Sequence, residues 1–237
     1  MATNFLTARW EKLVIANYEI DPKLLQKYIP FGTELDLFEG NCLVSLIGFM
    51  FLNTKLKGVK VPFHSNFEEV NLRFYVKKLE QGEWKRGVVF IKEIVPKPAI
   101  TIIANTLYQE HYHTMRMNHH WEITDATLQI EYAFFYKNQW HSFSISSETN
   151  PYDFQPGSEE EFITEHYWGF TQISTLKTSE YEVAHPKWKI YPTKDYSIHI
   201  DFKKVYGSNF AGLNDAIPKS IFLAEGSDVA VKGKSKK

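Results

Sequence analysis

The sequence predicts a mainly β protein of the α+β class, in which an antiparallel sheet curls or closes and a few helices flank it. The 237 residues include 18 Phe, 13 Tyr and 6 Trp, and aromatic side chains suit the half-buried surface of a pleated sheet. Strand-like segments outnumber helix-like ones, and hairpin-scale connections separate them. A chain of this length can bury a substantial core.

The first predicted elements are a helix, a strand and a hairpin. In IDPKLLQKYIP, Asp21 can cap a helix and Pro22 suits its first position, while a second proline ends the run. An apolar strand follows at about 41–52. EEVNLRFYVKKL (68–79) then alternates between apolar and polar side chains, and GEWKRGVVFIKEI (82–94) completes a hairpin with it.

Two further helices are expected along the rest of the chain. One follows Pro98 and runs into a histidine-rich stretch, and the other begins at Ser158, which is spaced from Glu161 as in a capping box. The remaining segments are predicted to be strands: ATLQIEYAFFY (126–136), QWHSFSISS (139–147), SEYEVAHPKW (179–188), YSIHIDFKKVY (196–206) and SIFLAEGSDVAVKG (220–233).

The charge, cysteine content and segment lengths exclude several classes of protein. A net charge of −1 gives no global basic field that would gather nucleic acid. The single cysteine, Cys42, excludes an internal disulfide, and no stretch reaches the roughly 18 apolar residues of a membrane helix. We therefore expect a cytoplasmic protein with no nucleic-acid or membrane partner. Residues 1–231 are expected to form a single domain, and residues 232–237 a basic disordered tail.

The strand at 68–79 has one polar face, made of Glu69, Asn71, Arg73 and Tyr75. The residues between them are apolar and point the other way, because side chains alternate across a sheet. Four polar residues on one strand face are typical of a face in water. The alternative is a pocket wall, in which the Arg73 guanidinium binds a carboxylate bidentately and Glu69 holds it or acts as a base.

The stretch LYQEHYHTMRMNHHW (107–121) contains four histidines: His111, His113, His119 and His120. Zinc takes three or four ligands in compact geometry, and ligands on a helix fall three or four residues apart. The histidines do not have this spacing, so we expect no metal site. They either line a pocket beside a tyrosine or have surface and structural roles.

A proline interrupts the strand pattern in HPKW (185–188). This is typical of an edge strand or bulge with a packed tryptophan. The alternative is that His185 lies at the mouth of a pocket.

Several motifs, in order along nearly the whole chain, resemble the YqjF-like family of uncharacterised proteins, which contain domain of unknown function 2071. The most specific are EVNLRFYV (69–76), HPKW (185–188) and AEGS (224–227). That family is similar to the acetoacetate decarboxylase superfamily. The resemblance implies a mainly antiparallel β-structure curled around a central cavity with a few flanking helices, and it favours the pocket-wall interpretation of strand 68–79.

The resemblance does not extend to the reactive amine. The decarboxylase works through a lysine Schiff base, and its lysine pair corresponds to about Tyr112–His113 in this sequence, where no lysine stands. Lys92 and Lys97 precede the helix and do not match the motif. An imidazole can serve as an acid or base but cannot replace a primary amine in imine chemistry. We therefore expect neither the decarboxylase reaction nor a cofactor.

Three functions remain open. The first is binding of a small apolar, carbonyl-bearing or carboxylate-bearing molecule in the cavity. The second is a cofactor-independent lyase, hydratase or isomerase acting on an oxo-acid, with Glu69 and His113 transferring protons. The third is a non-catalytic partner-binding protein, and the sequence also leaves a homo-oligomer open. The expected ligand-binding residues are Asn71, Arg73, Tyr75, Tyr112, Arg116 and His185.

Overall fold

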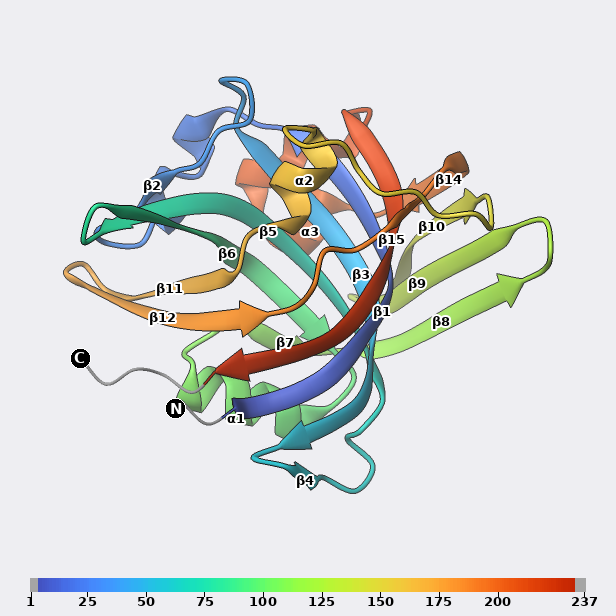
Figure 1. The fold of residues 1–237 in the computed structure, drawn as a ribbon, viewed down its shortest axis with the longest axis horizontal. Coiled ribbons are helices and arrows are strands. Elements are labelled where there is room, and N and C mark those ends of the chain that lie inside the picture. The colour runs from blue at the N-terminus through green and yellow to red at the C-terminus, as the bar shows by residue number, and fades with distance from the viewer. Residues whose placement is uncertain (1–3, 233–237) are drawn as a thin grey trace.

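The computed structural model describes residues 4–232 and is built mostly from strands (Figure 1). The strands are β1 (Asn4–Glu19), β2 (Glu34–Leu35), β3 (Leu43–Leu56), β4 (Val59–Lys60), β5 (Phe67–Glu80), β6 (Glu83–Val95), β7 (Tyr112–Thr114), β8 (Arg116–Ile123), β9 (Leu128–Tyr136), β10 (Gln139–Ser147), β11 (Trp168–Ser174), β12 (Lys177–Ala184), β13 (Ile190–Tyr191), β14 (Thr193–His199) and β15 (Ser220–Lys232). The helices are α1 (Pro98–Leu107), α2 (Glu159–Thr164) and α3 (Phe202–Tyr206), with 3-10 turns at Pro22–Leu24, Gln26–Tyr28 and Ser208–Asn214.

Within the described residues, 11 strands form a curled sheet and four strands form a second, smaller one. The main path of the larger sheet runs β2-β5-β3-β1-β15-β12-β11-β6-β7, and an additional pairing joins β6 back to β5. The strands from β5 round to β6 therefore form a ring. The sheet is mixed: β6 pairs in parallel with both β7 and β11, whereas its pairing with β5 is antiparallel. The fold prediction of a mainly β, curled structure with a few helices is confirmed.

The two faces of the ring have separate apolar cores. One core lies between the ring and the smaller sheet β14-β10-β9-β8, and it contains Val70, Leu72, Phe74 and Val76 of β5. The other lies inside the ring, where Phe49, Phe51 and Phe67 are buried. The predicted alternation of strand 68–79 is thus confirmed, and its polar face points into the ring.

Several local predictions differ from the structure. Residues 22–28 form two short 3-10 turns instead of one helix, although the Asp21 side chain does accept a hydrogen bond from the Lys23 amide, at 2.9 Å. The second half of segment 196–206 is helix α3 and not a strand. Strands β1, β7, β8 and β11 were not predicted. In β1 the inward and outward residues do not alternate cleanly in hydrophobicity. Strand β15 extends to Lys232, whose ammonium contacts Glu182, so the predicted tail begins too early.

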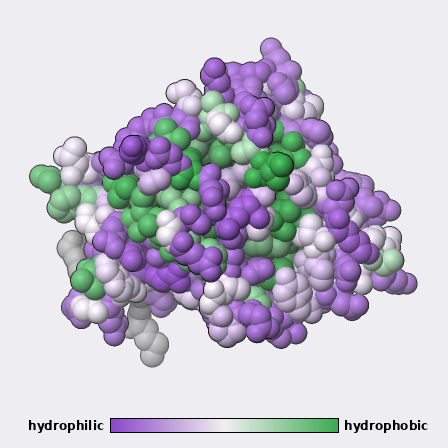
Figure 2. All heavy atoms as spheres, turned by 90° about the horizontal axis from the view of Figure 1, so that it is seen from above, coloured by the Kyte–Doolittle hydropathy of each residue, from purple (hydrophilic) through white to green (hydrophobic). Residues whose placement is uncertain are grey.

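Residues 233–237 of the predicted tail lie outside the described residues, and the single domain over 1–231 stays a prediction. Among residues 4–232, no helix is both long and apolar enough to cross a membrane. Figure 2 shows hydrophobic residues gathered in patches among hydrophilic ones on the face seen from above.

The contact between the two sheets depends on a residue without a side chain, Gly48 in β3. A Cβ atom there would lie 2.5 Å from Phe143 and 2.9 Å from Tyr132 of the smaller sheet. We predict that Gly48→Ala lowers the free energy of unfolding by about 2 kcal/mol or more, because an overpacked core must shift both rings. Chemical denaturation measures the change.

Gly212 provides the matched control, because nothing lies within 4 Å of a Cβ built there. Gly212→Ala should change the free energy of unfolding by less than about 1 kcal/mol. Equal effects of the two substitutions would contradict the close packing of Gly48 against the smaller sheet.

Candidate functional site

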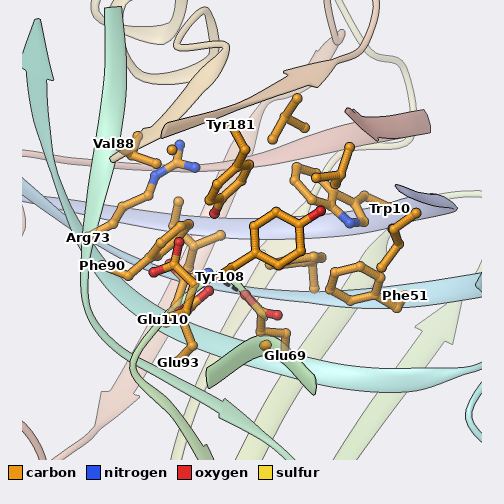
Figure 3. A pocket seen from close by; sticks show the side chains of 18 of the residues that line it. Trp10, Phe51, Glu69, Arg73, Val88, Phe90, Glu93, Tyr108, Glu110 and Tyr181 are labelled. Carbon is orange, nitrogen blue, oxygen red and sulfur yellow. Dashed lines mark hydrogen bonds between the residues drawn. The ribbon is translucent and has the colours of Figure 1, made fainter. Parts of the chain in front are cut away.

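A cavity of about 120 Å³ lies inside the ring and is lined mainly by aromatic and aliphatic side chains (Figure 3). This is close to the roughly 150 Å³ of an apolar cavity that holds one benzene ring. The Trp10 ring lies 5.1 Å from Phe49, 5.7 Å from Phe51 and 6.2 Å from Trp188, measured between ring centroids. Helix α1 borders the cavity through Ile100, Ile103 and Ala104.

Three glutamates, Glu69, Glu93 and Glu110, lie in the wall of this otherwise apolar cavity, and each is at least 94% buried by surface area. Figure 3 shows them gathered on one side, facing Tyr108 and Tyr181. The Asn71 amide donates to Glu69 Oε1 at 2.9 Å, and the Tyr112 hydroxyl donates to Glu69 Oε2 at 2.9 Å. Glu93 Oε2 is buried and has no hydrogen-bond partner among residues 4–232.

Burial dominates the ionisation of this carboxyl cluster, which we define as Glu69, Glu93 and Glu110. Burial raises the pKa of Glu69 to about 7, although hydrogen bonds from Asn71 and Tyr112 oppose the rise, and nearby Glu110 adds to it. Burial also raises the pKa of Glu93 well above its ordinary range, and the neighbouring Glu110 and Glu69 raise it further. Carboxylates crowded into an apolar site cannot all ionise. The cluster therefore retains protons near neutral pH.

A β-bulge decides which side chain of β6 enters the cavity. Val88 and Phe90 line it, so strict alternation would put Lys92 inside and Glu93 outside. The register with β5 instead shifts between Leu72↔Lys92 and Arg73↔Phe90. Glu93 consequently points inward, while the Lys92 ammonium lies on the outer face and donates to the Val205 carbonyl. Bulges commonly redirect a side chain in this way beside functional sites.

Glu110 of the cluster, and Tyr112 beside the cluster, are positioned by segments that are distant in the sequence. Glu110 follows helix α1, and the Thr171 hydroxyl of β11 donates to its Oε1 at 2.8 Å. Tyr112 lies opposite Glu93 in the parallel β6–β7 pair. The Asn105 side chain of α1 bonds both the amide and the carbonyl of Tyr112, each at 2.9 Å. The end of α1 thereby holds Tyr112 against the carboxyl cluster.

Arg73 and two histidines complete the polar part of the wall. Arg73 Nη2 donates to the Ile163 carbonyl at 3.0 Å, which leaves its buried Nε without a partner among the described residues. Burial lowers the pKa of His185 to about 4, and its ring stacks on Trp188 at 4.2 Å. Burial also lowers the pKa of His166 to about 4. Both imidazoles are neutral at neutral pH.

Five of the eight residues expected from the sequence line the cavity: Glu69, Asn71, Arg73, Tyr112 and His185. The cavity-lining residues Glu93, Glu110, His166 and Tyr181 were not expected. No alternation or spacing in the sequence points to Glu93, Glu110 or His166. They reach the cavity through the bulge in β6, the α1–β7 connection and the closure of the ring. Alternation along SEYEVAHPKW would have put Tyr181 on the same face as Val183 and His185, and that signal was available.

The other three expected residues lie elsewhere, which corrects the roles expected for them. Tyr75 faces the ring interior, but its hydroxyl is 2.6 Å from Ser45 Oγ and its ring does not line the cavity. His113 is exposed and lies next to Tyr112 on β7, so its side chain points away from the cavity and from Glu69. Arg116 is exposed on β8, where its guanidinium lies over Phe135 and Trp140.

The histidines of stretch 107–121 do not converge. His111, His119 and His120 are exposed, as His113 is, and His119 Nδ1 lies 2.6 Å from Glu68. Over residues 4–232, no group of three or more His, Cys, Asp or Glu side chains has an arrangement that could hold a metal ion. The contribution of this stretch to the carboxyl cluster comes from Glu110 and Tyr112 instead.

Solved structures with the same fold are acetoacetate decarboxylase-like proteins. Acetoacetate decarboxylase from Legionella pneumophila is 13% identical, with a TM-score of 0.62 over 97% of this chain and 86% of that one. An acetoacetate decarboxylase-like enzyme from Sphingomonas wittichii is 9% identical, with a TM-score of 0.66 over 99% and 93%. The enduracididine biosynthesis enzyme MppR, complexed with the condensation product of pyruvate and imidazole 4-carboxaldehyde, is 10% identical, with a TM-score of 0.66 over 97% and 88%. At these identities the likeness concerns the fold alone.

The sequence comparisons identify the family. The uncharacterized protein YqjF of Bacillus subtilis is 32% identical over 68 residues, a match that spans 28% of this chain and 28% of that protein. The model of the uncharacterized conserved protein family DUF2071 matches residues 7–228. The chain therefore belongs to the DUF2071 family and has an acetoacetate decarboxylase-like fold.

Proposed function

We propose that this protein binds a small, mainly apolar molecule in the aromatic cavity and places a carbonyl oxygen of that molecule against the carboxyl cluster. The observation that supports this proposal is the burial of three glutamates inside an apolar wall. A protonated carboxyl is a hydrogen-bond donor, and a carbonyl oxygen is an acceptor without charge. A cytoplasmic setting and a single domain remain part of the proposal.

A neutral carbonyl suits the cluster better than a carboxylate does. A bound carboxylate would add another acid beside Glu69, Glu93 and Glu110, and like charges in a buried site are costly. Arg73 could offset that charge, as the sequence suggested, but one of its donors already serves the Ile163 carbonyl. A Schiff-base step is not proposed, since no lysine is among the described residues that line the cavity.

Acetophenone is a suitable probe, because it combines one ring with one carbonyl. We expect it to bind at pH 6 and to bind at least about tenfold more weakly at pH 9, since Glu69, whose pKa is about 7, has lost its proton by then. Isothermal titration calorimetry measures both affinities. In Glu69→Gln the pH dependence should shrink, because an amide donates at both pH values.

The control is Glu68→Gln, a substitution of the same kind on the neighbouring residue, whose carboxylate faces His119 instead of the cavity. It should behave like the wild type. Failure of acetophenone to bind, or an affinity that does not change with pH, would contradict the proposal. If benzoate bound more tightly than acetophenone and Arg73→Ala abolished that preference, the site would instead be a carboxylate clamp.

Acid–base catalysis on the bound carbonyl compound is a second candidate, favoured by the pKa of Glu69 near 7 and by its hydrogen bond from Tyr112. A base with such a pKa can remove a proton from the carbon next to a carbonyl, while a protonated carboxyl supports the oxygen. In this alternative, Glu93 or Tyr112 replaces His113 as the second proton-transfer residue beside Glu69.

We predict that the protein accelerates deuterium exchange of the acetophenone methyl protons in D2O, followed by proton NMR. Glu69→Gln should slow the exchange by at least about a hundredfold, while Glu68→Gln should leave it unchanged. Exchange at the uncatalysed rate, with acetophenone bound, would show a binding protein without this catalysis.

A further inference from the structure

A second polar group lies in the cavity wall, built around His166, which follows helix α2. The side chain of His166 is fully buried, and its Nε2 lies 3.0 Å from Asp36 Oδ2. The same carboxylate oxygen accepts from Arg86 Nε at 2.6 Å. The His166 ring packs against Phe162 and Tyr75, at centroid distances of 5.0 and 4.8 Å.

The hydrogen bonds fix which nitrogen of His166 carries the proton. Burial opposes ionisation of Asp36, but the hydrogen bonds from His166 and Arg86 outweigh it and lower the pKa of that carboxyl. An ionised carboxylate can only accept hydrogen bonds, so His166 Nε2 must be the donor. Since the ring is neutral, Nδ1 has no hydrogen and presents a lone pair.

That lone pair lacks a donor. His166 Nδ1 is buried and has no hydrogen-bond partner among residues 4–232. The neighbouring Tyr75 hydroxyl is already engaged with Ser45. Leaving a buried acceptor unsatisfied costs free energy. Because His166 is one of the residues that line the cavity, a donor that enters with a ligand is a suitable partner for this nitrogen.

Arg73 also lines the cavity, and its charge acts to lower the pKa of both Glu69 and His166. The cavity therefore offers proton donors at the cluster and an acceptor at His166, with an aromatic wall around them.

We propose that His166 Nδ1 accepts a hydrogen bond from a hydroxyl or N–H group that the ligand carries in addition to its carbonyl. The substrate class is thus a small ring-sized carbonyl compound that carries a second, donating group. Asp36 is a positioning residue, because it holds the tautomer of His166 that leaves Nδ1 free. This inference rests on the proposed function, since it presupposes that the carbonyl lies at the carboxyl cluster.

Two pairs of probes of matched size test the inference. Acetophenones with a hydroxyl at ring position 3 or 4 are compared with the same compounds carrying a methyl group, by calorimetry at pH 6.5. In at least one pair the hydroxyl compound should bind the wild type about tenfold more tightly or better, because it satisfies the buried nitrogen. His166→Gln keeps a donor for Asp36 but has no acceptor at the place of Nδ1. In this variant the ratio of the two affinities, hydroxyl compound over methyl compound, should fall to about one.

His141→Gln is the control, because His141 is also fully buried but lies in the smaller sheet, stacked on Phe134 away from the cavity. It should retain the preference. If His166→Gln does not fold, nitrogen-15 NMR of the wild type replaces it. Addition of the hydroxyl compound should shift the unprotonated Nδ1 resonance of His166, and addition of the methyl compound should not.

The outcomes separate this inference from the function on which it rests. Equal binding of hydroxyl and methyl compounds, with the expected fall at pH 9, would overturn the role of His166 and leave the carbonyl site standing. A protonated Nδ1 in the free protein would also overturn it. Failure of every acetophenone to bind would overturn both.

Discussion

Three carboxyl groups that share one apolar cavity cannot all be charged, and the chemistry of this protein follows from that constraint. Removing a carboxylate from water is costly, and a second one nearby adds repulsion. Glu69, Glu93 and Glu110 meet both conditions inside the ring of strands. The cavity therefore holds protons where an ordinary surface would hold negative charge, and it offers hydrogen-bond donors to a ligand that brings an acceptor.

The architecture maintains this arrangement through three local features. The bulge in β6 turns Glu93 inward and Lys92 outward, which places an acid in the wall and an amine outside it. The β5–β6 pairing closes the ring around the cluster. The Asn105 side chain donates to the Tyr112 carbonyl and accepts from the Tyr112 amide, and these two hydrogen bonds hold Tyr112 beside Glu69. Each feature is a backbone or side-chain contact that helps to keep the three acids buried in the wall of the cavity.

The parts of the site that were predictable from sequence are those that depend on local periodicity. Alternation along β5 was enough to place Glu69, Asn71 and Arg73 on one face, although alternation alone could not tell a wet face from a pocket wall. Closure of the ring decides that question, and closure is a long-range property. The same limit explains the error at His113. Tyr112 and His113 were both expected in the pocket, but they are neighbours in one short strand, and only its pairing with β6 shows that Tyr112 is the one that faces inward. The inward position of Glu93 could not be predicted for a different reason: a bulge in β6 reverses the alternation on which the prediction depends.

The most direct test of the protonated cluster is the pH dependence of the free energy of unfolding of the wild type, Glu69→Gln and Glu68→Gln. The pKa of Glu69 rises from 4.5 to about 7 on folding, so between these values the folded protein binds more protons than the unfolded chain. The free energy of unfolding must then fall as the pH rises through this window. We predict that the fall is smaller by about 3 kcal/mol in Glu69→Gln, while Glu68→Gln follows the wild type. Parallel profiles for the wild type and Glu69→Gln would show that the pKa of Glu69 does not rise on folding, and would contradict a carboxyl cluster that retains its protons near neutral pH.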